Sequence, residues 1–150
     1  MLNSFKIARA CEDHIDDIMV VENLSFEIPW SRQSITDEFL HNDNAVYFCA
    51  VADGKAVGYA GMWLVLDEGH ITNIAVHPDF RRCGIGGSLM RALLEEAEKR
   101  GLAALTLEVR RSNDSARYLY EKYGFEDGGV RKGYYADNNE DAIIMWKRLK

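Results

Sequence analysis

A short apolar strand, a glycine-rich turn and an amphipathic helix follow one another in this chain, and together they constrain its fold most. The apolar segment ends at Ile74-Ala75-Val76, and the turn Gly84-Ile85-Gly86-Gly87 opens the helix, which Gly101 ends. One face of the expected helix carries Leu89, Met90, Leu93, Leu94 and Ala97. A strand that leads into such a helix is typical of α/β folds, in which the helix packs on a sheet.

Antiparallel strands are expected before this segment, and a strand and a helix alternate after it. Asp53-Gly54 joins two apolar runs and is a strong hairpin signal, and Asp67-Glu68-Gly69 is the next expected turn. Asp13 and Ser31 are expected to cap two N-terminal helices. The expected strands are 5–9, 46–52, 55–66, 70–76, 104–109 and 142–149, with a further helix over 113–123. This order predicts an α/β fold with a mixed sheet.

The length and composition predict a single domain over residues 1–150. The chain is 47% hydrophobic and 28% charged, as in ordinary folded proteins, and it has no internal repeats. Its longest apolar run, Ala45–Ala52, is too short to span a bilayer. The first residues lack the pattern of a signal peptide, and three widely spaced cysteines suit reduced thiols, so we expect a cytoplasmic protein without membrane contact.

Charge is distributed unevenly along the chain. Residues 1–75 contain 4 basic and 12 acidic side chains, whereas residues 76–150 contain 14 and 12, for a total of −6. An acidic N-terminal half argues against nucleic-acid binding, which needs a continuous basic face. The uneven charge is compatible with a basic partner at the acidic half and an anionic ligand at the other half. Charged residues that serve only solubility would give the same numbers of acidic and basic side chains.

The glycine-rich turn has the features of a phosphate-binding loop. Glycines let a ligand approach the backbone closely, and N–H groups at a helix start present the positive end of the dipole. Arg81 and Arg82 add positive charge. A Walker loop is excluded because no lysine precedes Ser88, and the dinucleotide fingerprint is excluded because Leu89 stands where its third glycine would be. A tight turn without a ligand is the alternative.

Several motifs resemble those of one enzyme family. Arg81-x-x-Gly84-x-Gly86, after a strand that ends at Val76, resembles the acetyl-CoA signature of the GNAT acetyltransferases. The motifs that narrow the resemblance to the bacterial ribosomal-protein-alanine N-acetyltransferases are Pro29–Ser31, Leu107–Arg110, Ser112-Asn113, Leu119–Glu121, Gly124-Phe125, Arg131–Tyr135 and Glu140–Ala142. The resemblance covers essentially the whole chain. It implies a GNAT fold with a mixed central sheet and helices on both faces. It also implies acetyl transfer from acetyl-CoA to the N-terminal amine of a protein, with the N-terminal alanine of a small-subunit ribosomal protein as the expected acceptor.

The resemblance also implies roles for individual residues. The CoA pyrophosphate would be held by the N–H groups of Arg82, Cys83, Gly84, Ile85, Gly86 and Gly87, in a motif that begins at Arg81. Ile74, Ala75 and Val76 would pair with the pantetheine arm, and Asn113 would contact the cofactor. Glu108 is implied as the general base and Tyr120 as the general acid. Trp30, Tyr134 and Tyr135 would line the peptide groove.

The acid and base roles also follow from the chemistry. Aminolysis of a thioester needs a neutral amine, an acceptor for the amine's proton and a donor to the departing thiolate. Glu108 lies near the end of an apolar strand, where burial would raise the pKa of its carboxyl group, and Tyr120 supplies a phenol on the next helix. The alternatives are an outward-facing Glu108 that pairs with an arginine and a Tyr120 that only packs.

Two other chemistries are not favoured. Acetyl transfer of this kind needs no covalent enzyme intermediate, so Cys83 is not expected to act as a nucleophile. The four histidines lack metal-ligand spacing with one another or with cysteines, so no metal is expected. Two other functions remain open from the sequence: acetylation of a lysine or a small-molecule amine, and a module that binds acyl-CoA without catalysis.

Overall fold

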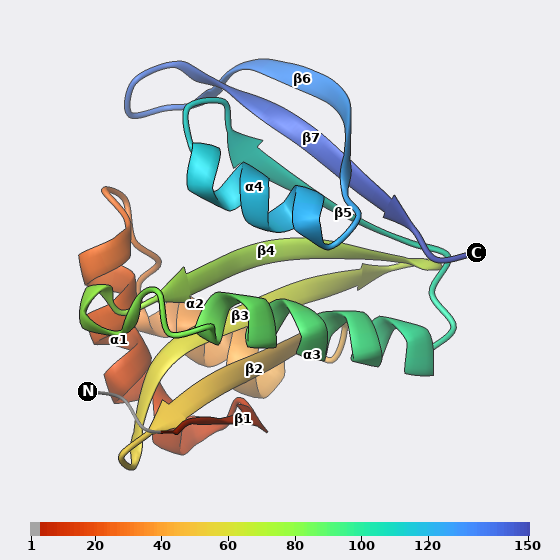
Figure 1. Ribbon diagram of the computed structural model, residues 1–150. Coiled ribbons are helices and arrows are strands. Elements are labelled where there is room, and N and C mark those ends of the chain that lie inside the picture. Colours follow the sequence, from red (N-terminus) through yellow and green to blue (C-terminus); the bar gives the residue numbers. More distant parts are fainter. Residues whose placement is uncertain (1–3) are drawn as a thin grey trace.

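The computed structural model describes residues 4–150 and contains one mixed sheet of seven strands in the order β1-β2-β3-β4-β5-β7-β6 (Figure 1). The strands are β1 (Lys6–Arg9), β2 (Ala45–Ala52), β3 (Lys55–Val65), β4 (Glu68–Val76), β5 (Ala104–Arg110), β6 (Glu126–Tyr135) and β7 (Glu140–Arg148). The helices are α1 (Ile15–Ser25), α2 (Arg32–Thr36), α3 (Ile85–Lys99) and α4 (Asp114–Lys122), with short turns η1 (Glu12–His14), η2 (Asp37–His41) and η3 (Pro78–Phe80). Within these residues no helix is both long and apolar enough to cross a membrane.

Strands β2 to β4 form the expected antiparallel meander, with one predicted turn confirmed and one shifted, and β1 pairs antiparallel with β2 at its outer edge. Asp53 and Gly54 both have positive φ, 52° and 77°, as a tight two-residue hairpin requires. The next turn lies at Leu66 and Asp67, so the prediction of Gly69 as a turn residue is wrong. Gly69 lies inside β4, where a Cβ would come within 2.5 Å of Leu105 Cδ2 on the neighbouring strand. Glycine at this position serves close packing.

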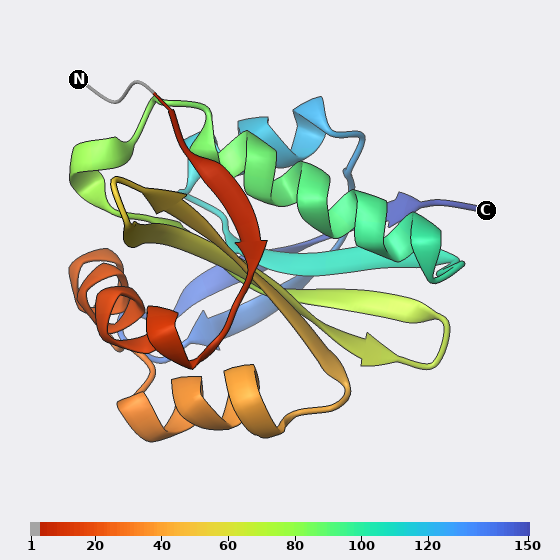
Figure 2. The ribbon, with the colours of Figure 1, turned by 90° about the horizontal axis from the view of Figure 1, so that it is seen from below.

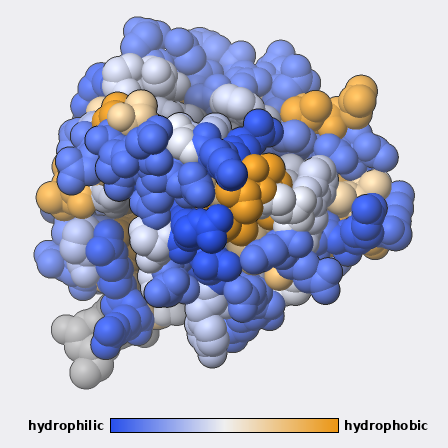
Figure 3. Space-filling view, turned by 90° about the horizontal axis from the view of Figure 1, so that it is seen from above, coloured by the Kyte–Doolittle hydropathy of each residue, from blue (hydrophilic) through white to orange (hydrophobic). Residues whose placement is uncertain are grey.

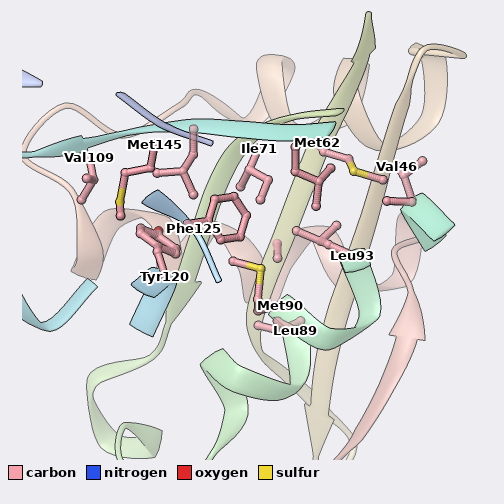
Figure 4. Close-up of a cluster of buried hydrophobic side chains, with 14 of the residues drawn as sticks. Val46, Met62, Ile71, Leu89, Met90, Leu93, Val109, Tyr120, Phe125 and Met145 are labelled. Atoms are coloured by element: carbon pink, nitrogen blue, oxygen red, sulfur yellow. The ribbon is translucent and has the colours of Figure 1, made fainter. Parts of the chain in front are cut away.

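Helices cover both faces of the sheet, as predicted (Figure 2). Helices α3 and α4 cover one face, where the larger core contains Leu89, Met90 and Leu93 of α3 and Tyr120 of α4 (Figure 4). Helices α1 and α2 cover the other face with a second core of residues from α1, α2, β2, β3 and β4. None of the buried residues in this second core comes from β5, β6 or β7. The α1–α2 side of β5 to β7 is therefore left to the site described below.

The neighbouring strands β4 and β5 pair only at one end. Their three parallel pairs are Glu68↔Ala104, Gly69↔Leu105 and His70↔Thr106. Beyond these pairs the two strands diverge, and the opening between them lies where α3 and α4 begin (Figure 1). We call this opening the β4–β5 split. The backbone of Ile74-Ala75-Val76 at the end of β4 therefore has no partner strand on the β5 side.

Two local predictions are corrected by the structure. Asp13 does not cap a helix, because residues 12–14 form a 3₁₀ turn in which Cys11 N–H donates to His14 Nδ1 at 3.2 Å. Strand β6 was not expected, because its residues are mostly exposed and it contains Gly128, Gly129 and Gly133, which are depleted in strands. It forms because β7 offers it a pairing edge at the end of the sheet.

Candidate active site

The glycine-rich turn presents unpaired backbone N–H groups beside the split. Gly84 is the N-cap of α3 with φ of 82°, and Arg82 has φ of 63°, so the loop before the helix is sharply curled. The first hydrogen bond of the helix runs from Ser88 N–H to the Gly84 carbonyl at 3.1 Å. Within residues 4–150 no acceptor receives the N–H groups of residues 82–87. Such groups at the start of a long helix favour an anion.

The glycines of this turn differ in how much space the surrounding protein leaves for a Cβ atom. A Cβ on Gly86 would lie 3.6 Å from Leu119 Cδ2, which is an ordinary contact, and one on Gly84 would meet nothing within 4 Å. Gly87 is different, since its Cβ would lie 2.8 Å from the Tyr123 hydroxyl. The protein packing therefore explains glycine at 87 but leaves open space at 86. That space fits a ligand that approaches the backbone.

The side chains beside the turn are oriented differently from one another. Arg81 Nε donates to the Val76 carbonyl at 3.2 Å and so ties the loop to the end of β4. Arg82 is exposed, and the exposed Cys83 thiol lies 3.6 Å from the Arg81 carbonyl. Asn113 is the N-cap of α4, where its Oδ1 accepts from Ala116 N–H at 3.2 Å. No acceptor within the described chain takes the Asn113 amide NH₂ group, so this donor is available at the split.

Glu108 lies on the α1–α2 side of β5. Leu107 and Val109 face the α3–α4 core, so strand alternation turns Glu108 to the opposite side. The expectation that burial surrounds this carboxylate is wrong, because Glu108 is exposed and its Oε1 lies 3.5 Å from Arg131 Nε of β6. The interaction with Glu108 raises the pKa of the neighbouring Tyr134 phenol. The outward-facing, arginine-paired carboxylate is thus the arrangement observed.

Tyr120 approaches from the opposite face. It projects from α4 into the α3–α4 core, is 9% exposed, and its ring centroid lies 6.0 Å from that of Phe125 (Figure 4). Burial, with a smaller contribution from Tyr135, raises the pKa of the Tyr120 phenol to about 12. Its hydroxyl has no hydrogen-bond partner within residues 4–150, yet it is not among the fully buried atoms. The phenol is therefore protonated at neutral pH and reachable.

The three predicted groove residues lie on two separate segments. Trp30 is half-buried in the loop between α1 and α2, and its backbone N–H donates to Glu22 Oε2 at 2.7 Å. Tyr134 and Tyr135 end β6, with ring centroids 5.1 Å apart and nearly perpendicular planes. Both segments extend to the α1–α2 side, on which Glu108 lies. The surface over β6 and β7 is mostly hydrophilic, with small separate apolar patches (Figure 3).

An ion-pair cluster at the β6–β7 turn was not predicted from the sequence. Arg110 lies 3.9 Å from the centre of the Tyr135 ring, 2.9 Å from Asp137 Oδ2 and 3.4 Å from Glu140 Oε1. Carboxylates at 137 and 140 raise the pKa of Arg110, and Glu140 also accepts from Ser112 N–H at 2.7 Å. This cluster holds Tyr135 and the turn against β5. The spacing of these residues gives no sequence signal, because two segments about 25 residues apart supply them.

No metal site accompanies these groups. Within residues 4–150 no three His, Cys, Asp or Glu side chains are arranged to hold a metal ion. The arrangement offers instead an anion-binding helix start, an open strand edge, a carboxylate on one face and a phenol on the other.

Comparison with known proteins identifies the family. The family model described as "Acetyltransferase (GNAT) family" matches residues 15–125. The [ribosomal protein bS18]-alanine N-acetyltransferase of Escherichia coli strain K12 is 41% identical over 127 residues, which cover 83% of this chain and 84% of the relative. A Bacillus subtilis protein, whose name assigns it the same activity provisionally, is 43% identical over 134 residues and 89% of each chain.

A solved structure supports the same assignment. The crystal structure of the ribosomal-protein-S18-alanine N-acetyltransferase from Escherichia coli superposes with a TM-score of 0.89 at 36% identity, covering 98% of this chain and 95% of that one. The predicted GNAT fold, with its mixed sheet and helices on both faces, is confirmed. This chain belongs to the GNAT family of acetyltransferases.

Proposed function

We propose that this protein transfers the acetyl group of acetyl-CoA to the α-amine of an N-terminal alanine, with ribosomal protein bS18 as the substrate. The names of its relatives in Escherichia coli support this substrate. The observation that carries the proposal is the placement of Glu108 and Tyr120, which approach the β4–β5 split from opposite faces of the sheet. Aminolysis of a thioester needs a proton acceptor near the amine and a separate proton donor near the departing thiol, and two side chains from different faces can supply them.

The donor substrate fits the residues around the split. Acetyl-CoA supplies an activated thioester and a pyrophosphate group. The N–H groups of residues 82–87 would hold the pyrophosphate, and the unpaired edge of β4 at Ile74-Ala75-Val76 would bond to the amides of the pantetheine arm. The Asn113 amide would donate to the same molecule. A backbone N–H near Val76 would polarise the thioester carbonyl.

Proton transfer falls to the two side chains. An α-amine has an ordinary pKa of about 7.7–8.0, against about 10.4 for lysine, so at pH 7 roughly a tenth of it is already unprotonated, a far larger fraction than for lysine. The exposed carboxylate of Glu108 would take its proton, directly or through water. Tyr120, whose pKa is raised to about 12, remains protonated and would donate to the thiolate. When the substrate's amine binds, Glu108 would give up its ion pair with Arg131 and contact the amine instead.

The surface charge supports a basic peptide. The first 75 residues contain 12 acidic side chains and 4 basic ones, and the exposed Glu27 lies in the same loop as Trp30. Such a surface would attract a positively charged segment behind the substrate's N-terminus. The proposed substrate assigns the reaction to the cytoplasm, where the unpaired thiols of Cys11, Cys49 and Cys83 would stay reduced.

Two peptides test the proposal. One begins with free Ala-Arg and contains no lysine, and the other has a blocked N-terminus and one free lysine. Thiol release from acetyl-CoA and tandem mass spectrometry of the product should give acetylation of the first peptide, with a rate that falls as salt rises. A lysine-acetylated product would instead indicate a lysine acetyltransferase. Tight acetyl-CoA binding with no turnover on any amine would indicate a binding module.

A further inference from the structure

A buried carboxylate lies outside the catalytic pair. Glu22 of α1 is 1% exposed, and no Lys, Arg or His within residues 4–150 forms an ion pair with it. Its Oε1 accepts from the Tyr59 hydroxyl of β3, and its Oε2 accepts from Trp30 N–H at 2.7 Å. A buried charge without a cation is costly unless hydrogen bonds satisfy it. These two accepted hydrogen bonds are what the carboxylate contributes at this buried position.

Glu22 holds the loop that carries Trp30. Residues 27–30 connect α1 to the N-cap Ser31, and they include Pro29, which has no N–H group. Across the described part of the chain, the bond from Trp30 N–H to Glu22 is the one hydrogen bond that these four residues make. Ile28 is 68% exposed and adds little packing. The position of Trp30 thus depends on this bond to a buried acceptor together with the packing of its side chain against the second core.

The same carboxylate is connected to the acetyl-donor strand. The Tyr59 hydroxyl, which donates to Glu22, accepts from Asn73 Nδ2 at 2.8 Å. Asn73 follows a β-bulge, since Met62 pairs with Ile71 and Gly61 with Asn73, which leaves Thr72 without a partner. The bulge turns Asn73 toward α1, and the next residues are Ile74-Ala75-Val76. A hydrogen-bonded chain therefore runs from β4 through Tyr59 and Glu22 to the backbone of Trp30.

We propose that Glu22 is a positioning residue for the acceptor peptide. It holds the Trp30 wall of the groove at a set distance from the stretch of β4 that presents the acetyl donor. This inference rests on the proposed function, in which Trp30 lines the peptide groove and β4 holds acetyl-CoA. Loss of the Glu22 acceptor then weakens peptide binding and leaves donor binding intact, because the glycine turn and the edge of β4 do not depend on the loop.

Glu22→Met is the informative substitution. Methionine has nearly the same volume, so the core stays filled while both acceptors are lost, and Tyr59 keeps its bond from Asn73. Glu22→Gln is the conservative variant, since its amide oxygen accepts from Trp30 N–H and its NH₂ donates to Tyr59. Ile18→Val, in the same helix and core, is the matched control for a general loss of stability, because Ile18 is fully buried and makes no contact of this kind.

The experiment measures two constants on the full-length protein: the KM for the Ala-Arg peptide at saturating acetyl-CoA, and the calorimetric Kd for acetyl-CoA. We expect Glu22→Met to raise the peptide KM roughly tenfold or more, as loss of a hydrogen bond to a charged group does, with acetyl-CoA Kd unchanged. Glu22→Gln should restore most of the peptide KM, and Ile18→Val should change neither constant. An unchanged peptide KM in folded Glu22→Met, or a parallel loss of acetyl-CoA affinity, overturns the inference.

Amide hydrogen exchange separates this inference from the proposed function. Exchange of the Trp30 amide should be faster in Glu22→Met than in the wild type and near wild type in Glu22→Gln, whether or not the peptide is a substrate. If the wild type leaves the Ala-Arg peptide unmodified, the proposed function fails. If the wild type acetylates it while Trp30 exchange and peptide KM do not respond to Glu22→Met, only the role of Glu22 fails. If Glu22→Met does not fold, the exchange rate of the Trp30 amide in Glu22→Gln is compared with that in the wild type instead. A rate far above that of the wild type would overturn the inference.

Discussion

Replacing Gly86 with alanine should change stability and donor affinity in opposite directions. Gly86 has helical backbone angles, and its new Cβ would meet Leu119 Cδ2 at an ordinary 3.6 Å. Glycine in a helix costs roughly 0.5–1 kcal/mol relative to alanine, so Gly86→Ala should raise the free energy of unfolding by about that amount or somewhat less, because the site is in the first turn. Nothing in the protein itself opposes the change.

The affinity for acetyl-CoA should fall at the same time. The Cβ would occupy the space through which a pyrophosphate approaches the N–H groups of residues 82–87. Loss of one hydrogen bond to a charged group costs about 1.5–3 kcal/mol. At about 1.4 kcal/mol for each factor of ten, the Kd should rise roughly 10- to 150-fold. Arg82→Ala, which removes one exposed and partly screened charge, should have a much smaller effect.

Two measurements decide this prediction. Chemical denaturation gives the change in stability, and isothermal titration with acetyl-CoA gives the change in Kd. A Gly86→Ala protein that is as stable as expected and still binds acetyl-CoA like the wild type would refute the reasoning, since the turn would then be only a structural connection between β4 and α3. Gly87→Ala is the contrasting variant, because its Cβ would lie 2.8 Å from the Tyr123 hydroxyl and should also lower stability.

Three further predictions concern the catalytic pair and the sheet. Glu108→Gln should lower turnover most near neutral pH and less at high pH, where more of the amine is already unprotonated; equal loss at every pH, seen in a pH–rate profile, would argue against a base at this position. Tyr120→Phe should slow turnover, while the Kd for acetyl-CoA, measured by calorimetric titration, stays unchanged. Because the pKa of Tyr120 is raised to about 12, deprotonation of this phenol should not reduce wild-type activity between pH 9 and about 11. Gly69→Ala should lower the free energy of unfolding by about 1–3 kcal/mol, because a Cβ within 2.5 Å of Leu105 Cδ2 overpacks the core and the buried Leu105 side chain must shift; a melting temperature equal to that of the wild type would contradict this packing argument.

Local features of the fold were predictable because short-range signals determine them. Asp53-Gly54 needs only the positive φ angles of its own two residues to form a hairpin, and α3 needs only the glycine turn before it and its apolar face. The motif from Arg81 to Gly86 is likewise local, which is why the anion-binding turn and the family could be inferred from the chain alone. Each of these elements is contiguous in sequence.

Features that depend on contacts between distant segments follow only from the tertiary structure. Strand β6 exists because β7 offers an edge, although its own residues favour no strand. Glu108 is exposed on the α1–α2 side of β5, where the second core, within residues 4–150, includes no buried residue of that strand. The bond from Glu22 to Trp30 also requires the folded loop between α1 and α2. Burial, strand pairing and charge partners depend on how the strands and helices assemble. A local sequence pattern does not show which distant segments will come into contact. For that physical reason the residue types of the site could be predicted from the sequence, whereas their faces, partners and protonation follow only from the assembled fold.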